Sequence, residues 1–452
     1  MPATATEIVL RRLNEGPAAS AELERLLGQS QSSTSRLLRE LLSRNEIIRL
    51  GATRGARYAR LRTLEGIGSQ WPLRRVGEDG SIHDIGILRA LAGSAYDLES
   101  SARGFVYAGT TNGLPYFLHD QRPAGFLGRT VPRRYPELNL PQRVIDWNDD
   151  HYLRYLTQHG SDTVSDLILG DAALNGYLAS VRRPPDVLSD ERALRYPQIA
   201  EEVTQGGYAG SSAHGEHPKF AITLQGPEGV RHVLVKFSPP RSTRVGERWA
   251  DLLIAEHLAH ELLAGAGLPA ASSRIELTGN RAFLEVDRFD RVGAAGRIGV
   301  TSLLAIDASL YGSLDNWIES AARLHRDRRI ETATLEQVRL VATFGALIAN
   351  TDRHFGNIAF LDRYDGRFSL APVYDMLPML FAPEHDQVMT RVFAPPDPTS
   401  LTLQSYARAR SLAERYWRRC GEDERISNEF RGICAACLTS LEALPRTGAF
   451  GG

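Results

Sequence analysis

Apolar residues recur at helical spacing in three short segments within residues 6–42. The second segment has Ser20 as its expected N-cap and ends at Gly28. Alternating apolar and polar positions between residues 47 and 61 then predict a hairpin. Three helices followed by a hairpin predict a winged helix-turn-helix over residues 1–64, whose third helix enters the major groove of DNA.

The predicted third helix and wing are basic. Between residues 31 and 62 there are eight arginines and two glutamates, an excess of six positive charges in a chain of net charge −1. Arginines suit contacts with phosphates, and small polar residues suit contacts with bases. The alternative is a helical docking module whose arginines are solvated. The residues expected to contact DNA are Ser32, Ser33, Ser35, Arg36, Arg39, Arg54 and Arg57.

The pattern is less regular from the predicted wing to residue 200. Glycine and proline interrupt any period within residues 65–80, which predicts a linker. Short apolar strands and helical runs alternate over residues 81–200 and predict a separate mixed segment. The sequence of residues 65–200 does not indicate a catalytic or binding function.

A glycine-rich loop at residues 206–219 leads into a predicted hairpin. Small residues let backbone N–H groups approach phosphate oxygens, and a lysine on the neighbouring strand can add a point charge. Of the 53 basic residues, only Lys219 and Lys236 are lysines. Because every other basic residue is arginine, two lysines close together indicate a site that requires compact ammonium groups. The alternative is that the two lysines occur there by chance.

The next elements follow the order of a kinase N-lobe, which we expect over residues 201–290. A predicted helix carries Glu256 on a face where it could pair with Lys236, and a second hairpin follows. In kinases such a Lys–Glu pair orients the lysine onto the ATP phosphates. Asp287 and Phe289 lie in the connection to the helical part, where an adenine would bind.

The remaining residues, 291–452, predict a helical C-lobe that contains a phosphoryl-transfer loop. Asp352 and Asn357 follow an apolar helix at the spacing of a kinase D-x-x-x-x-N, and Asp375 follows a predicted hairpin. One aspartate can accept the proton of an attacking hydroxyl, while the asparagine and the second aspartate hold magnesium. Capping and turn formation are the alternative roles for acidic residues after a helix.

Composition adds two expectations. The hydrophobic fraction is 42%, and the chain has neither a run of eighteen apolar residues nor a signal-peptide pattern, so we expect a soluble cytoplasmic protein without a membrane partner. The three cysteines are an odd number late in the chain, which favours core thiols over a disulfide framework.

Four motifs together resemble the HipA family of bacterial serine/threonine kinases, which act as toxins in toxin–antitoxin systems. They are the loop SSAHGEHPK, the run VDRFDR, and the segments NTDRHFGN and YDMLP. The resemblance begins at about residue 81, so that 81–200 would be the family's N-terminal subdomain. It implies an α+β fold of the diverged, two-lobed kinase type, ATP and Mg²⁺ as cofactors, a protein substrate, and room for a separate antitoxin.

The resemblance also implies a role for each matching residue. Asp352 would be the catalytic base, and Asn357 and Asp375 would be the magnesium ligands. Ser212 would be the autophosphorylated serine, with Ser211 as the alternative. The residues implied to contact ATP are Lys236, Glu256, Asp287, Phe289, Ser211, Ser212, Ala213, Gly215 and Lys219.

This chain departs from the family pattern in two ways. His217 stands where the family usually has glutamine, two residues before the loop lysine. The predicted DNA-binding module is fused to the chain, whereas the family usually borrows one from an antitoxin, which suggests a stand-alone variant that binds DNA itself. Two other functions remain open, a nucleotide-sensing transcriptional regulator and a small-molecule kinase.

Overall fold

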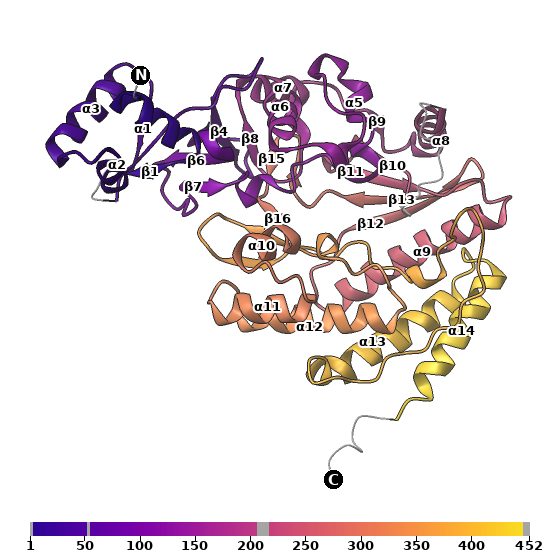
Figure 1. The fold of residues 1–452 in the computed structure, drawn as a ribbon. Helices are drawn as coiled ribbons and strands as arrows, with labels where there is room; N and C mark the ends of the chain where they lie inside the picture. The colour runs from indigo at the N-terminus through magenta and orange to yellow at the C-terminus, as the bar shows by residue number, and fades with distance from the viewer. Residues whose placement is uncertain (1–2, 52–54, 206–216, 446–452) are drawn as a thin grey trace, which may run out of the picture. The chain divides into compact units, whose positions relative to one another are not determined.

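The computed structural model describes residues 3–51, 55–205 and 217–445. These residues form two compact units (Figure 1). The first comprises Met1–Pro123, Val131–Arg182 and Tyr364–Gly366, and the second comprises Ala124–Thr130, Arg183–Arg363 and Arg367–Gly452. None of the helices within the described ranges is long and apolar enough to cross a membrane.

Unit 1 begins with three helices and a small antiparallel sheet. Buried Val9, Leu23 and Leu38 join α1, α2 and α3 in one apolar core. The three helices and the hairpin were expected, whereas the added strand β1 was not. Ser20 as the N-cap of α2 was a wrong prediction, because Ala19 occupies that position, while Gly28 does end the helix at a φ of 60°. The elements are α1 (Ala5–Asn14), α2 (Ser20–Leu27), α3 (Gln31–Ser43), β1 (Ala18–Ala19), β2 (Ile48–Leu50) and β3 (Arg57–Ala59), with strand order β1-β3-β2.

The predicted linker at residues 65–80 is wrong, because much of it is strand β4, Gln70–Val76. Trp71 and Leu73 alternate inward, but the next buried residue is Val76. The register shifts at the same place, where the partner strand has an extra residue, Ile85, between the partners of Leu73 and Arg74. This break in alternation, together with Pro72, explains why the sequence pattern hid the strand.

Strand β4 lies within a five-stranded antiparallel sheet of order β7-β6-β5-β4-β8. The other strands are β5 (Ile82–Ala90), β6 (Ala95–Ser100), β7 (Gly109–Asn112) and β8 (Leu167–Leu169). The helices of this part are η1 (Ala92–Ser94), η2 (Tyr116–Leu118), α5 (Val131–Arg134), η3 (Pro136–Leu138), η4 (Val144–Asp146), α6 (Asp149–His159), η5 (Gly160–Asp162) and α7 (Asp171–Val181).

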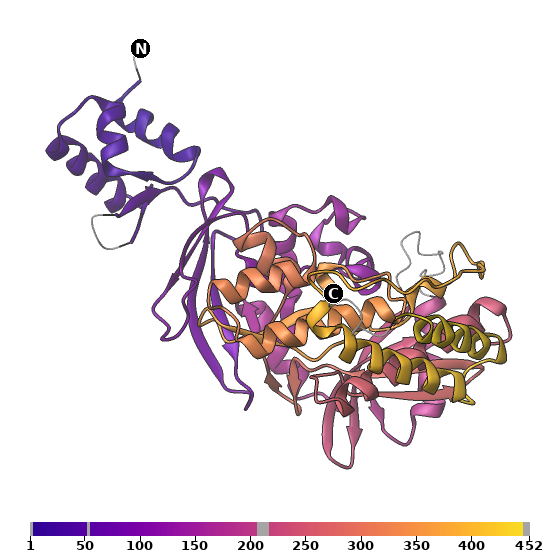
Figure 2. The same ribbon diagram turned by 90° about the horizontal axis from the view of Figure 1, so that it is seen from below.

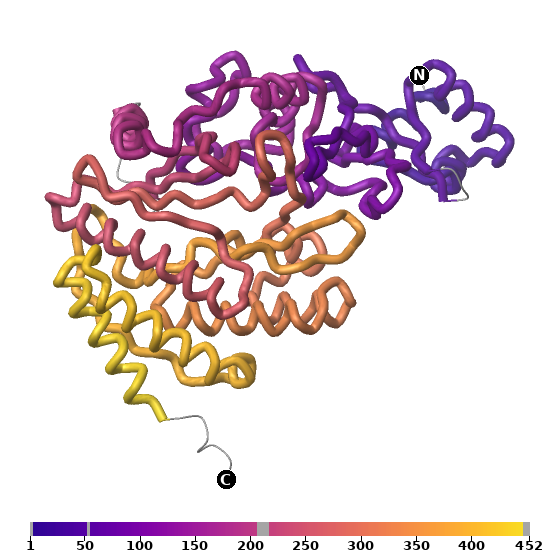
Figure 3. Tube along the Cα trace, turned by 180° about the vertical axis from the view of Figure 1, so that it is seen from behind, coloured from indigo at the N-terminus to yellow at the C-terminus, as the bar shows by residue number. Residues whose placement is uncertain are grey.

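Unit 2 begins with a second five-stranded sheet, of order β12-β13-β11-β10-β9. Helix α9 lies along β12 and β13 (Figures 1 and 3), and its apolar residues pack against these strands. The predicted boundary at residue 200 is wrong, since Tyr196 of α8 is buried against Phe220 and Phe283 of this sheet. The elements are α4 (Gly125–Gly128), β9 (Val187–Leu188), α8 (Arg192–Val203), β10 (Lys219–Gly226), β11 (Gly229–Phe237), α9 (Arg244–Gly265), β12 (Ser273–Thr278) and β13 (Arg281–Asp287).

The rest of unit 2 is mainly helical, and α13 and α14 lie side by side (Figures 1 and 2). Cys420, Cys434 and Cys437 are free, buried thiols of these helices, which confirms their prediction as core residues. The helices are α10 (Leu303–Leu310), α11 (Trp317–Arg326), α12 (Thr332–Leu347), η7 (Phe355–Asn357), η8 (Met379–Phe381), α13 (Leu403–Glu422) and α14 (Asn428–Glu442). The strands are β14 (Arg291–Val292), β15 (Gly296–Arg297), β16 (Val300–Ser302), β17 (Ala359–Asp362) and β18 (Phe368–Leu370), with β16-β17-β18 as one sheet.

Candidate active site

A buried lysine joins two carboxylates in unit 2. Nζ of Lys236 on β11 donates to Oε1 and Oε2 of Glu256 on α9 at 2.7 and 2.8 Å, and it also donates to Oδ1 of Asp375. Lys236 is 6% exposed and Glu256 is 1% exposed. The geometry of the predicted Lys236–Glu256 pair is therefore confirmed, and Asp375 shares the same ammonium group.

The strand alternation of β11 positions this lysine. Val235 and Phe237 pack into the apolar core that contains Tyr196, so Lys236 between them points to the opposite face. Lys219 on β10 is its direct cross-strand partner. The chain's two lysines are therefore neighbours on one face of the sheet.

The two lysines control the charge of Asp375. Burial opposes its ionisation, but the ammonium groups of Lys236 and Lys219 outweigh burial and lower the pKa of the Asp375 carboxyl to about 2. The carboxylates of Asp375 and Glu256 raise the pKa of Lys236 against the effect of its burial. The site therefore holds a charged lysine and a charged aspartate at neutral pH.

Asn350 connects the loop that carries Asp352 to Asp375. Its Oδ1 accepts from the backbone N–H of Asp352 at 3.0 Å, and its Nδ2 donates to the carbonyl of Asp375 at 3.2 Å. Asn350 is 1% exposed, and Ala349 before it and Asp375 both have positive φ, 59° and 51°. Non-glycine residues at such φ values are uncommon and cluster at functional sites. The link from Asn350 to Asp375, 25 positions away, was missed by sequence reasoning.

Asn357 holds the other end of the same loop. Its Nδ2 donates to the carbonyl of Asp352 at 2.8 Å, which leaves the amide oxygen as the atom that could accept a cation. The Tyr374 hydroxyl donates to the carbonyl of Gly356 at 2.6 Å, and the Phe289 ring lies tilted beside that of Tyr374 with ring centroids 5.8 Å apart. Phe289, expected beside an adenine, thus contacts a residue that supports the loop of Asp352.

Asp352 itself faces solvent. Its side chain is 50% exposed, and Nε2 of His354 lies 4.0 Å from its Oδ1. The loop is held through its backbone by Asn350 and Asn357, so the Asp352 carboxylate remains accessible to an incoming hydroxyl group.

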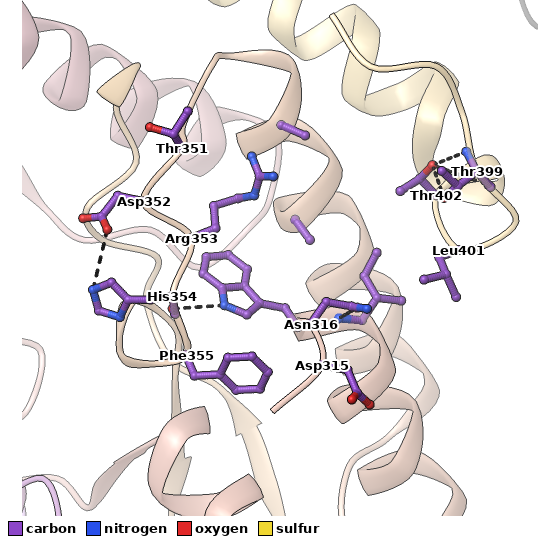
Figure 4. A pocket seen from close by; sticks show the side chains of 14 residues that line it. Asp315, Asn316, Thr351, Asp352, Arg353, His354, Phe355, Thr399, Leu401 and Thr402 are labelled. Carbon is purple, nitrogen blue, oxygen red and sulfur yellow. Dashed lines mark hydrogen bonds and ion pairs between the residues drawn. The ribbon is translucent and has the colours of Figure 1, made fainter. Parts of the chain in front are cut away.

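Asp352 lines a pocket of about 510 Å³ (Figure 4). The loop of Asp352 forms one side, and the start of α11, the middle of α12 and residues 399–402 form the others. Nε1 of Trp317 donates to the carbonyl of His354 at 3.1 Å and fixes α11 to this loop. The lining residues are Asp315, Asn316, Trp317, Ile318, Ala342, Ala346, Thr351, Asp352, Arg353, His354, Phe355, Thr399, Leu401 and Thr402.

Asp287 already has a protein partner at the end of β13. Its carboxylate accepts from Nε of Arg231 at 2.9 Å. Two residues earlier, buried Glu285 accepts from Nε of Arg192 and from the hydroxyl of Tyr196, each at 2.6 Å. This network ties α8 to the connection that leads into the C-lobe, and sequence reasoning missed it because the partners lie about ninety positions apart.

The remaining predicted residues are placed as follows. The ring of His217 is 4.6 Å from that of Trp249. On α3, Ser32, Arg36 and Arg39 are exposed, whereas Ser33 and Ser35 are half-buried. Exposed Arg57 donates to the carbonyl of Pro17 at 2.5 Å. Ser211, Ser212, Ala213, Gly215 and Arg54 lie outside the described residues.

The side chains of Asn357 and Asp375 can be compared with the ligands that Mg²⁺ prefers. In the ranges that the structure describes, no three His, Cys, Asp or Glu side chains form a cluster that could hold a metal. Mg²⁺ does not require one, because it usually takes one or two protein oxygens and completes its octahedron with phosphates and water. Asn357 and Asp375 supply oxygens of this type and therefore fit the ion.

Buried His260 gives the site a pH-dependent stability. It is 1% exposed, its Nδ1 lies 3.1 Å from the Ser273 hydroxyl, and burial and then Lys236 lower its pKa to about 3. Unfolded histidine titrates near pH 6.5, so between these values only the unfolded chain binds the proton. Stability therefore falls as the pH is lowered from about 6.5, by up to about 1.4 kcal/mol per pH unit.

We expect His260→Gln to flatten this dependence. The measurement is urea unfolding at about pH 7 and about pH 5. Replacing exposed His83 with glutamine serves as the control and should leave the wild-type slope unchanged. If the free energy of unfolding of His260→Gln changes with pH as it does in the wild type, His260 is not the source of this pH dependence.

Comparisons with known proteins agree with this architecture. Residues 67–178 match the model of the YjjJ-like toxin middle domain, and residues 211–441 match that of the HipA-like C-terminal domain. Toxin YjjJ of Escherichia coli (strain K12) is 35% identical over 428 residues, which cover 93% of this chain and 94% of that protein.

A solved structure shows the fold. A chain of the complex of HipA, HipB and operator DNA from Shewanella oneidensis MR-1 aligns with a TM-score of 0.54 at 14% identity, over 82% of this chain and 96% of that one. The two-lobed, kinase-like α+β fold expected from the sequence is confirmed.

Proposed function

Because this chain belongs to the family of HipA-like toxins, we propose that it is an ATP- and magnesium-dependent kinase that phosphorylates a serine or threonine of a protein. The observation that carries the proposal is one connected set of side chains. Lys236 joins Glu256 to Asp375, and Asn350 joins Asp375 to the loop of Asp352. These are the groups that phosphoryl transfer requires.

Each residue has a defined part in the reaction. The substrate hydroxyl oxygen bonds to the γ-phosphorus with release of ADP, and Asp352 takes the hydroxyl proton. Lys236 and Lys219 stabilise the charge on the phosphate oxygens. Asn357 and Asp375 would hold Mg²⁺, which neutralises phosphate charge when bound.

Transfer of radioactive γ-phosphate from ATP tests this function. Purified protein is incubated with [γ-³²P]ATP, Mg²⁺ and a cell extract, and label is measured separately in precipitated protein and in small molecules. Label in protein is the expected result. Label confined to small molecules would indicate a small-molecule kinase, and its absence from both fractions would contradict kinase activity.

Regulation and partners are also part of the proposal. Autophosphorylation at Ser212, or at the adjacent Ser211, would act on the glycine-rich loop; the support for this is the match of the loop motif to the HipA family. An antitoxin partner is supported by the complex in which the structurally similar HipA is bound to HipB.

DNA binding is a second function, favoured by the exposed surface of α3. Arg36 and Arg39 are solvent-exposed one turn apart, and Ser32 is exposed near the N-terminus of the same helix. The side chains that stabilise the three-helix core lie on the other face. An arginine-bearing free face on the third helix suits phosphate contacts in a major groove.

We expect the double variant Arg36→Ala/Arg39→Ala to weaken binding to double-stranded DNA by about tenfold or more and to reduce the slope of log affinity against log salt by about 2. Fluorescence anisotropy over a salt series measures both quantities. Arg25→Ala, an exposed arginine on α2, is the matched control. Equal affinities for the double variant and the wild type would contradict a role for α3.

A further inference from the structure

We propose that the pocket beside Asp352 binds an apolar side chain of the protein segment that carries the phosphorylated hydroxyl group. This inference rests on the proposed kinase function and assigns the substrate class of its site. The pocket and the catalytic base share one surface, because Asp352 is itself a lining residue (Figure 4).

The floor of the pocket is made of small residues. Ala342 and Ala346 lie one turn apart on α12 and are both half-buried lining residues, whereas neighbouring Phe344 and Leu347 are fully buried in the protein core. A larger side chain at either alanine would occupy the space. The other apolar lining residues are Trp317, Ile318, Phe355 and Leu401.

Most polar groups of the lining already have partners within the protein. Asp315 accepts from Arg323 at 2.6 Å, and the Asn316 side chain accepts from two backbone N–H groups of α11 at 3.0 Å each. Nη1 of Arg353 donates to the Asn350 carbonyl at 2.6 Å. A ligand therefore gains little by pairing with these groups, and burial of apolar surface is the main source of affinity.

Leucines extend the apolar surface beyond the pocket. Leu314 precedes the lining residue Asp315 and is 42% exposed, and Leu403 follows the lining residue Thr402 and is 55% exposed. The backbone N–H of Leu314 donates to buried Asp307 at 2.9 Å, which holds this leucine at a positive φ of 49°. Exposed apolar residues beside a binding pocket are typical of a protein interaction site.

These observations favour a polypeptide as the occupant. Its hydroxyl would lie at Asp352, a nearby apolar side chain would fill the space over Ala342 and Ala346, and flanking residues would contact Leu314 and Leu403. A small polar metabolite would leave this apolar surface uncovered.

A peptide library tests the proposal. Each peptide has a central serine and one flanking position fixed as Leu, Phe, Gly, Asp or Lys, and kcat/KM is measured for the full-length protein. We expect Leu or Phe at one position to exceed Gly by about tenfold or more. In the Ala346→Leu variant, kcat/KM should be equal for the Leu and Gly peptides. The ratio of these two values does not depend on the fraction of active protein.

Matched variants separate the outcomes. Ala342→Leu should act like Ala346→Leu, while Ala407→Leu, at an exposed alanine of α13, should keep the wild-type ratio. The proposal is overturned if no position selects an apolar residue, if both pocket-filling variants retain the selection, or if ATP is hydrolysed without transfer to any peptide. A wild-type protein that neither hydrolyses ATP nor transfers phosphate would instead contradict the kinase function itself.

Discussion

Replacing Asp352 with alanine lowers the rate of phosphate transfer by about 10²- to 10⁴-fold, the usual contribution of a general base. The fold and ATP binding should be preserved. The Asp352 side chain is half exposed, and the loop is held mainly by the backbone N–H and C=O of this residue, which the substitution leaves in place. The transfer rate, the melting temperature and the ATP dissociation constant are measured together.

Asp190→Ala is a suitable control, since Asp190 is an exposed aspartate of the same unit. It should match the wild type in all three measurements. An Asp352→Ala protein that transfers phosphate at the wild-type rate would show that this carboxylate is not the base, and the kinase assignment would lose its central residue.

Replacing Lys236 with alanine should have the largest effect on stability. The substitution leaves buried Glu256 and partly exposed Asp375 without the cation that they share. Removing one partner of a buried ion pair typically costs about 3–5 kcal/mol. Phosphate transfer should be lost as well, because we propose that this lysine stabilises the charge on the nucleotide phosphates.

The change in stability of Lys236→Ala with pH follows from the direction of the pKa shifts of the carboxyl groups. In the wild type the pKa of Asp375 is lowered to about 2, so its contribution is present above the unfolded value of about 3.9 and is lost as the pH falls through about 2. Without Lys236, burial favours the protonated form of the Glu256 carboxyl group. The loss of stability relative to the wild type should therefore be smaller at about pH 5 than at about pH 8.

A double-mutant cycle checks the interpretation. Lys236→Met combined with Glu256→Gln removes both charges and should recover part of the free energy of unfolding that Lys236→Met alone loses, without restoring activity. Urea unfolding of the four proteins measures the coupling. Additive effects of the two substitutions would contradict a stabilising pair.

Much of this site could be predicted from the sequence. The two lysines stood out by residue type, because every other basic residue is arginine. Glu256 followed from its place on the next helix. Asp352 and Asn357 were found by their spacing, since both lie in one short loop. In each case the information was local, within about twenty positions.

The missed features depend on contacts between distant segments. The sequence gives no sign that the Asn350 amide reaches the carbonyl of Asp375, or that Arg192 and Tyr196 converge on Glu285. Such contacts exist only once segments that are far apart in the sequence have come together within each lobe. Strand β4 was missed for a different reason, because its buried residues Trp71, Leu73 and Val76 break the alternation on which strand prediction depends.

The most direct test of the account is the intact mass of the purified protein after incubation with ATP and Mg²⁺, measured beside Asp352→Ala and Ser212→Ala. The protein must first be shown to be free of phosphate. The account predicts one added phosphate on the wild type and none on either variant. An unchanged mass for the wild type, or an equal gain for Asp352→Ala, would contradict it.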